Sequence, residues 1–534
     1  MISVGAVTGF MTAVNTENIF LAVLVGVLSS SAFASIHALV TVVLKQDQTV
    51  SGLILTILGL ALSSLLGKNY VGKKLVTKLE GVTSVTDPSS ILEVLISQNI
   101  IFYLADDQDK LDYGSYGNPN VETSNVDLLV SQGLKFDNFY TGQAICAPSR
   151  SQIFTGMYPV KNGCLANHIG VKPDIKSVTS LLKKSGYEVV LAGKSHVKPN
   201  KVFNWTHYFP KVQNRFLPLT QIDNYLKNVD KPFCLIIASD FPHGPYPKTP
   251  NYSKQDIYKL PYDPSYIGNH KPGYYQNIED DNDQLGEVLQ MVDRHGHKDN
   301  SMFFYASDHG LSGKWGLSEQ GLQVPFVVRW PGKIKSNTKS NTLLTLVDVL
   351  PTLLEAAKTD IPNSIDGKSF LKTLLGSNEQ INDYVFGVAT KQNIRECKIF
   401  PSRMVRGKRF KLIRNFNSIE VVDSNLGENP VVNEFAKIAA ESFPNIPYEE
   451  LYDLKKDPYQ KNNLINNSDY TQHRNRLSDV LEKWMKKQND FVLDNPISVI
   501  KPTLHPLDKN SKWNKVSEEL TGKLKEEDYV KLHY

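Results

Sequence analysis

Cysteine is scarce in this chain, because only Cys146, Cys164, Cys234 and Cys397 occur among 534 residues. They are widely scattered, which excludes a disulfide scaffold and a CxxC zinc site but leaves room for a single bridge. A strong charge of one sign is also lacking. The formal net charge of +4 is small for this length and argues against a protein that coats nucleic acid.

Long apolar runs are confined to the first eighty residues. Residues 19–44 carry no charge apart from that of His37 and are long enough to span a bilayer, whereas the second run, 50–66, is marginal. Gly, Ala and Ser are frequent in both runs, as in packed membrane helices. A cleavable signal peptide fits poorly, since no basic region precedes the first run. We therefore expect a transmembrane helical segment through residues 18–66, with a pair of buried soluble helices as the alternative.

From residue 98 onward, short apolar runs alternate with helical stretches. Runs typical of buried strands lie at 99–105, 188–193, 232–240, 301–308 and 324–332, and helical stretches lie at 126–134, 178–184, 283–294 and 343–357. Strands that alternate with helices predict an α/β fold with a mostly parallel sheet covered on both faces.

Three of the predicted strands end in polar clusters. Asp106-Asp107 follow the first, Ser239-Asp240 end the third with His243 just beyond, and Asp308-His309 follow the fourth. In open α/β sheets such clusters meet at one rim, where three carboxylates would repel one another without a cation. Oxygen ligands favour a hard ion, Ca²⁺ or Mg²⁺. The alternative for the Asp-Asp pair alone is a helix cap or a turn.

The stretch ICAPSRSQIFTG, residues 145–156, places Cys146, Pro148, Ser149 and Arg150 within five residues. From these residues alone, Cys146 could be a nucleophile, a metal ligand or half of a disulfide. The C-x-P-S-R string with its Thr155-Gly156 resembles the signature of the type I, formylglycine-dependent sulfatases. Further motifs of that family occur in order: Asp106-Asp107, the GKSH of 193–196, Pro242-His243, the SDHG of 307–310, Lys314 and the ELYDL of 450–454. The resemblance covers roughly residues 98–490.

The resemblance implies an alkaline-phosphatase-like fold with a smaller C-terminal α+β subdomain. It also implies that a maturation enzyme oxidises Cys146 to Cα-formylglycine, whose aldehyde hydrates to a gem-diol. One hydroxyl then attacks sulfur, and the second expels sulfate and restores the aldehyde. By the same resemblance, Ca²⁺, with Mg²⁺ as the alternative, is held by Asp106, Asp107, Cys146, Asp308 and His309.

The family also implies roles for the basic residues. Arg150 would hold the diol, and Lys194 and Lys314 would neutralise developing charge. His243 would be the general acid to the leaving oxygen, and His196 would deprotonate the second hydroxyl. Taken singly, each could instead be an ordinary surface or structural residue. His309 departs from the asparagine of many relatives, and we interpret Gln108-Asp109 as flanking.

The segments 193–197 and 242–247 look similar to those of N-sulfoglucosamine sulfohydrolases and related glycan sulfatases. This makes a sulfated carbohydrate, joined through an ester or a sulfamate, the expected substrate. The alternatives are a phosphodiesterase or phosphatase of the same superfamily, against which Cys146 argues, and an inactive sulfatase-like binding protein. A membrane transport component is a further alternative.

The last alternative arises because residues 48–72 resemble part of an ABC-type sugar or nucleoside permease. We expect a permease-like membrane segment at 1–80, a linker at 81–97, a catalytic domain at 98–380, a subdomain at 381–490 and a polar tail at 491–534. The apolar segment 18–66 predicts membrane association, and the resemblance to glycan sulfatases implies an extracytoplasmic catalytic domain. Lys68, Lys73, Lys74 and Lys78 oppose this, because the positive-inside rule would keep that domain inside.

Overall fold

The computed structural model describes residues 7–8, 10–12, 24–26, 28–32, 99–167, 169–259, 271–389, 402–416, 447–493 and 525, and the backbone of 497–500 and 529–532. The chain divides into two units, residues 1–96 and 97–534. Within the described residues, no helix has the length and apolar character needed to cross a membrane. Most of residues 18–66 and all of 81–97 lie outside the described part, so the structure gives the transmembrane expectation no support.

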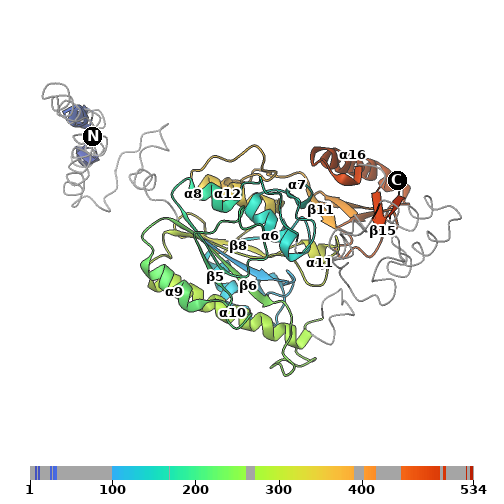
Figure 1. The fold of residues 1–534 in the computed structure, drawn as a ribbon, viewed down its shortest axis with the longest axis horizontal. Helices are drawn as coiled ribbons and strands as arrows, with labels where there is room; N and C mark the ends of the chain where they lie inside the picture. Colours follow the sequence, from blue (N-terminus) through green and yellow to red (C-terminus); the bar gives the residue numbers. More distant parts are fainter. Residues whose placement is uncertain are drawn as a thin grey trace. The chain divides into compact units, whose positions relative to one another are not determined.

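An eight-stranded sheet forms the centre of the second unit (Figure 1). Its strand order is β5-β4-β6-β1-β7-β8-β2-β9, and only the β7–β8 and β8–β2 pairs are antiparallel. The mixed, mostly parallel sheet expected from the sequence is therefore confirmed. The strands are β1 (Asn99–Asp106), β2 (Leu134–Phe136), β4 (Glu188–Gly193), β5 (His207–Pro210), β6 (Phe233–Pro242), β7 (Ser301–Ser307), β8 (Phe326–Arg329) and β9 (Thr338–Ser340).

The central strand β1 is buried on both faces, which explains its unbroken apolar sequence. Ile100, Phe102 and Leu104 join one core cluster with α6 (Cys146–Thr155), α8 (Val178–Lys183) and α12 (Val349–Ala356). Ile101 and Tyr103 point the other way, toward α5 (Ser124–Gln132), α9 (Leu219–Asn228) and α10 (Lys271–Arg294). Figure 1 shows α9 and α10 on one side of the sheet and α6, α8 and α12 on the other.

Two predicted helices have different bounds in the structure. The helix expected at 283–294 is the second half of α10, which extends over Lys271–Arg294. The helix expected at 343–357 is preceded by β10 (Leu344–Thr345), which pairs with β3 (Phe139–Tyr140), and by the short helix η4 (Leu346–Asp348) before α12 begins. Short helices also occur as η3 (Gly114–Tyr116), α7 (Pro159–Asn162), α11 (Glu319–Leu322) and α13 (Leu371–Leu374).

A smaller antiparallel sheet follows, with strands β11 (Val385–Ala389), β12 (Ser402–Arg406), β13 (Phe410–Asn415) and β14 (Glu449–Asp453) in chain order. After η5 (Ser468–Tyr470), α16 (Thr471–Lys487) packs Leu477, Leu481 and Trp484 against this sheet, and η6 (Phe491–Leu493) follows. The expected C-terminal α+β part is confirmed, while its boundaries stay a prediction. The expected polar tail contains two antiparallel strands, β15 (Ile497–Ile500) and β16 (Tyr529–Leu532).

Candidate active site

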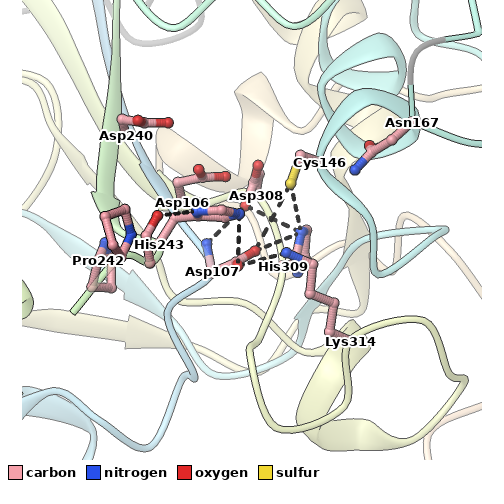
Figure 2. Close-up of polar contacts among 12 residues, drawn as sticks. Asp106, Asp107, Cys146, Asn167, Asp240, Pro242, His243, Asp308, His309 and Lys314 are labelled. Atoms are coloured by element: carbon pink, nitrogen blue, oxygen red, sulfur yellow. Dashed lines mark hydrogen bonds and ion pairs between the residues drawn. The ribbon is translucent and has the colours of Figure 1, made fainter. Parts of the chain in front are cut away.

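The polar clusters that follow the strands do meet at one rim of the large sheet. Strands β4, β6, β1 and β7 run parallel, so their carboxyl ends share one edge. Asp106 ends β1, Lys194 follows β4, Asp240 lies near the end of β6, and Asp308 follows β7. Figure 2 shows the carboxylates converging there on the side chains of Cys146 and His309. This topology brings together residues up to about two hundred positions apart in sequence.

Cys146 is the first residue of α6 and is 1% exposed. Its Sγ lies 3.4 Å from His309 Nε2 and 3.9 Å from Asp107 Oδ1. Burial opposes ionisation of the thiol, but Lys314 and Lys194 outweigh it and lower the pKa of Cys146 below its ordinary value. Cys146, Cys164 and Cys234 are all free thiols, so Cys146 is not half of a disulfide within the described residues.

The Thr155-Gly156 end of the signature has a structural role. Gly156 closes α6 with a φ of 63°, in the left-handed region that glycine adopts without strain. A Cβ at this position would meet Ile365 Cγ2 at 2.8 Å. The backbone carbonyl of Gly156 also accepts a hydrogen bond from the amide of Asp366 at 2.9 Å. The signature thus combines a site residue at the start of α6 with the cap that ends it.

Arg150 is completely buried and bridges two carboxylates. Its Nε lies 2.9 Å from Asp308 Oδ2, and an Nη lies 3.2 Å from Asp106 Oδ1. A further Nη donates to the carbonyl oxygen of Lys194 at 3.2 Å. The alternative of an ordinary surface arginine is therefore wrong. Arg150 ties α6 to the ends of β1, β4 and β7, and removing it would take the arginine partner from Asp308 and leave Asp106 with Lys194 alone.

Two lysines bring positive charge to the same group of carboxylates. Lys194 pairs with Asp106 and also lies 3.0 Å from Asp240 Oδ1, whereas Lys314 Nζ lies 2.6 Å from Asp107 Oδ2. Burial opposes charge on both lysines, yet the carboxylates raise the pKa of each above its ordinary value. Burial likewise opposes charge on Asp107, but Lys314 and His309 lower the pKa of its carboxyl. These groups remain charged despite their burial.

Four of the five expected metal ligands form one compact group. The ligand atoms of Asp106, Asp107, Cys146 and His309 all lie within 4.8 Å of one another. Asp308 is adjacent, since its Oδ1 accepts the amide of Asp107 at 3.2 Å and lies 3.8 Å from His309 Nε2. Burial and the neighbouring Asp106 raise the pKa of Asp308 to about 7, as expected for crowded carboxylates. A divalent cation fits this set of residues, because its positive charge offsets the repulsion among the carboxylates. Most of the donor atoms that the set offers are oxygens, which such a cation prefers.

The two remaining histidines differ in their surroundings. His243 follows β6, is about 37% exposed, and has Nε2 3.7 Å from Asp107 Oδ2. Its Nδ1 lies 2.6 Å from the carbonyl oxygen of Gly244, to which it can donate, which leaves Nε2 toward the cluster. His196, at a φ of 53°, lies two residues beyond Lys194. Burial and the charges of Lys194 and Arg150 lower the pKa of His196 to about 4, which keeps its imidazole neutral.

Three further residues hold the site in place, and two of them, Asp109 and Asn167, were given no role from the sequence. Asp109, which we interpreted as flanking, is 1% exposed, and its carboxylate binds the amide and hydroxyl of Ser312. Ser149 Oγ donates to the carbonyl oxygen of Asp308 at 2.5 Å, and Asn167 Oδ1 accepts the amide of Ala147 at 2.9 Å (Figure 2 labels Asn167). Ser149 belongs to the C-x-P-S-R string, and Asp109 is a third acidic residue directly after a strand, whereas Asn167 gave no signal.

Two family models match the chain. One is described as sulfatase and matches residues 98–359, and the other is described as N-sulphoglucosamine sulphohydrolase, C-terminal, and matches residues 307–431. Neither match reaches residues 1–80, so the permease resemblance is without support. Both matches fall within the unit that contains the site.

Relatives cover most of the chain. An ulvan-active sulfatase of Formosa agariphila is 48% identical over 454 residues, which is 82% of this chain and 90% of that protein. The human N-sulphoglucosamine sulphohydrolase is 24% identical over 77% of this chain and 94% of its own length. A solved structure in complex with its substrate, D-glucosamine-2-N,6-O-disulfate, has a TM-score of 0.58 at 19% identity and covers 74% of this chain and 99% of that one. The likeness in structure supports the alkaline-phosphatase-like α/β fold.

Proposed function

Since this chain belongs to the sulfatase family and is a sulfuric ester hydrolase, we propose that it removes sulfate from a sulfated polysaccharide, with ulvan as the first candidate. We choose ulvan because the chain is 48% identical in sequence to an ulvan-active sulfatase. The human N-sulphoglucosamine sulphohydrolase is much more distant, so a sulfamate is the weaker candidate. No observation favours the phosphodiesterase, the transport component or the inactive binding protein.

The nucleophile, in this proposal, is Cys146 after its oxidation to Cα-formylglycine. The observation that supports it is the position of Cys146 Sγ, 3.4 Å from His309 Nε2 and inside the carboxylate cluster at the rim. Once hydrated, the aldehyde would supply one oxygen that attacks sulfur and a second hydroxyl that lets sulfate depart. A plain thiolate at this place would keep the sulfate as a stable adduct.

Asp106, Asp107, Asp308 and His309 would hold a divalent cation together with the oxygen that replaces Cys146 Sγ. Their oxygen-rich donor set suits Ca²⁺, with Mg²⁺ as the alternative. The cation would draw charge from the sulfate oxygens and so make sulfur more open to attack. The residues around it have a separate task, which is to orient the anionic substrate and to move protons.

Arg150 would fix the nucleophilic oxygen, because its guanidinium is held between Asp106 and Asp308. Lys194 and Lys314 lie beside Asp106 and Asp107 and would bind the sulfate oxygens. His243 is partly exposed and would protonate the leaving oxygen, which faces the solvent side. His196 is neutral at physiological pH and can therefore accept the proton of the second hydroxyl.

A polysaccharide is too large to enter a cell unaided, so we place the catalytic unit outside the cytoplasm. This part of the proposal agrees with the expectation of an extracytoplasmic enzyme. A formylglycine-generating enzyme and attachment to a membrane through residues 18–66 remain proposals of the same kind.

The experiment that tests the substrate is the release of inorganic sulfate from ulvan, compared with release from N-sulfated and O-sulfated glucosamine. We expect turnover on ulvan that exceeds turnover on the N-sulfated sugar. Mass spectrometry of the peptide that contains Cys146 tests the nucleophile, because the exchange of CH₂–SH for CHO makes the peptide lighter. An active preparation whose peptide carries only unmodified cysteine would rule the formylglycine out. Release of phosphate from phosphate esters at a higher rate would instead support the phosphatase alternative.

A further inference from the structure

A cavity lies away from Cys146, at the edge of the large sheet. It has a volume of about 590 Å³ and lies along β9 and the segment 373–380, with one contribution from Lys408 in the turn between β12 and β13. We call it the β9 groove. Its lining is strongly basic, because four lysines, at positions 333, 335, 339 and 408, face a single carboxylate, that of Glu379.

Three lysines of the β9 groove, Lys335, Lys339 and Lys408, are available to an anion. Lys335 and Lys339 are exposed, and no described carboxylate lies within ion-pair distance of either side chain. Lys408 Nζ donates to the neutral amide oxygen of Gln380 at 2.8 Å, which orients its ammonium without cancelling the charge. Hydroxyl and amide groups of Thr338, Asn341 and Asn378 complete the lining with donors and acceptors that suit sugar hydroxyls.

Strand directions connect this groove with the reacting rim. β7 runs parallel to β1, β8 is antiparallel to β7, β2 is antiparallel to β8, and β9 is parallel to β2. The carboxyl end of β9 therefore lies at the same edge of the sheet as Asp106. The residues just beyond it, Asn341 and Thr342, line the groove. Four strand spacings separate β9 from β1, which is roughly 19 Å.

From these observations we propose that the β9 groove binds a sulfated stretch of the polysaccharide chain, several sugars away from the sulfate that reacts. The inference rests on the proposed function, because a polymeric substrate is needed to reach both places. A polyanion held at two sites gains affinity through effective concentration, although each lysine adds only a modest contribution. A short substrate would fill the reacting site and leave the groove empty.

The test uses a double variant in the groove, in which Lys335→Glu and Lys339→Glu are combined. Its control combines Lys483→Glu and Lys487→Glu on α16, which changes the net charge by the same amount. Both control lysines are exposed and lie outside the groove lining. We expect the groove variant to raise the KM for ulvan about three- to ten-fold with kcat unchanged. The KM for a disaccharide cut from the same polymer should not move. The dependence of the ulvan KM on salt should also become weaker than in the parent and the control.

Binding without turnover separates this inference from the proposed function. Cys146→Ala is added to the parent, to the groove variant and to the control variant, so that none of them releases sulfate. Affinity electrophoresis in a gel that contains ulvan then measures how strongly each protein is retained by the polymer. If the groove variant loses retention and the control keeps it, the proposal that the groove binds the polysaccharide is supported. If the parent releases no sulfate from ulvan, only the proposed substrate is contradicted. Equal retention, or an equal KM for ulvan in groove and control variants, would overturn the inference.

Discussion

Asp109 holds Ser312 at two points: Oδ1 accepts the amide of Ser312 at 2.9 Å, and Oδ2 accepts its hydroxyl. The amide of Asp109 is itself bound to the hydroxyl oxygen of Tyr274 at 3.1 Å. Ser312 lies between His309 and Lys314, so this contact ties the loop that carries both residues to the end of β1. We therefore expect Asp109 to be a positioning residue that acts through Lys314.

We expect Asp109→Ala to lower kcat on a small sulfate ester roughly 100-fold, because a displacement of about 1 Å at a reacting group has an effect of that size. Asp109→Asn should lose less, since its amide oxygen can still accept the Ser312 amide. Steady-state kinetics on both variants provide the measurement. Asp112→Asn is the control, because Asp112 is equally buried but binds Asn118 and not the loop. Equal losses at the two positions would argue for a general packing effect.

Arg150→Lys should destabilise the fold by about 3–5 kcal/mol, because lysine cannot bridge Asp106 and Asp308 and leaves a buried charge with an incomplete partner. It should also lower kcat at least about 100-fold. Urea unfolding and sulfate release measure the two effects. Arg403→Lys is a matched control, because Arg403 forms a buried pair with Asp490 at 2.5 and 2.8 Å in the C-terminal part. This control should lose comparable stability while kcat stays near that of the parent.

Removal of divalent metal should abolish sulfate release and lower the Tm, since Asp106, Asp107 and Asp308 would repel one another without it. Re-addition of Ca²⁺ should restore activity more fully than Mg²⁺. Metal content measured by atomic emission should fall in Asp107→Ala and stay at the parental level in Asp240→Asn, whose carboxylate pairs with Lys194 and Lys211 instead. Full activity in Asp107→Ala would contradict the metal assignment.

His196 gives the enzyme an acid-sensitive element. Its pKa in the folded chain is about 4, against an ordinary value of 6.5, because burial and the nearby Lys194 and Arg150 disfavour the imidazolium. Between pH 6.5 and pH 4 the unfolded chain takes up a proton that the folded chain does not, so stability falls as the pH falls through this range. His196→Gln should reduce that loss of stability and lower kcat roughly 100-fold or more.

Thermal unfolding at a series of pH values measures the first effect, and sulfate release at pH 7 measures the second. His473→Gln is the control, because His473 stacks on Phe410 at the start of α16, with ring centroids 4.0 Å apart. Its pH curve should match that of the parent. A His196→Gln curve that also matches the parent would show that His196 does not contribute to the acid sensitivity.

Much of the site could be predicted from the sequence because each of its motifs is a short run of neighbouring residues. Asp106-Asp107 and Asp308-His309 follow apolar runs that are recognisable as strands, and parallel strands bring such ends together. The contacts of Arg150 could not be predicted in this way. They join a helix to strands that lie 44 and 158 positions away, and no local pattern encodes such a pairing.

The strands and helices that could not be predicted from the sequence are those whose regular structure depends on tertiary packing. β9 has only three residues, Thr338–Ser340, and its pairing with β2 supplies most of its regular structure. The first part of α10 was missed because Pro272-Gly273 has turn composition, whereas Tyr274, Tyr275 and Ile278 bury the face that makes the helix stable. Asp109 was set aside because its partner, Ser312, is 203 positions away.

The burial of Cys146 has a consequence for the order in which this residue is oxidised and α6 folds. Because Cys146 is 1% exposed at the start of a wholly buried helix, an oxidising enzyme could not bind this segment once α6 has packed against the sheet. The conversion of Cys146 to formylglycine that we propose would therefore have to take place while this segment is still unfolded. A chain that folds with an unmodified cysteine is committed to that state for as long as it stays folded. Under this proposal, the yield of active enzyme would depend on whether modification is faster than folding.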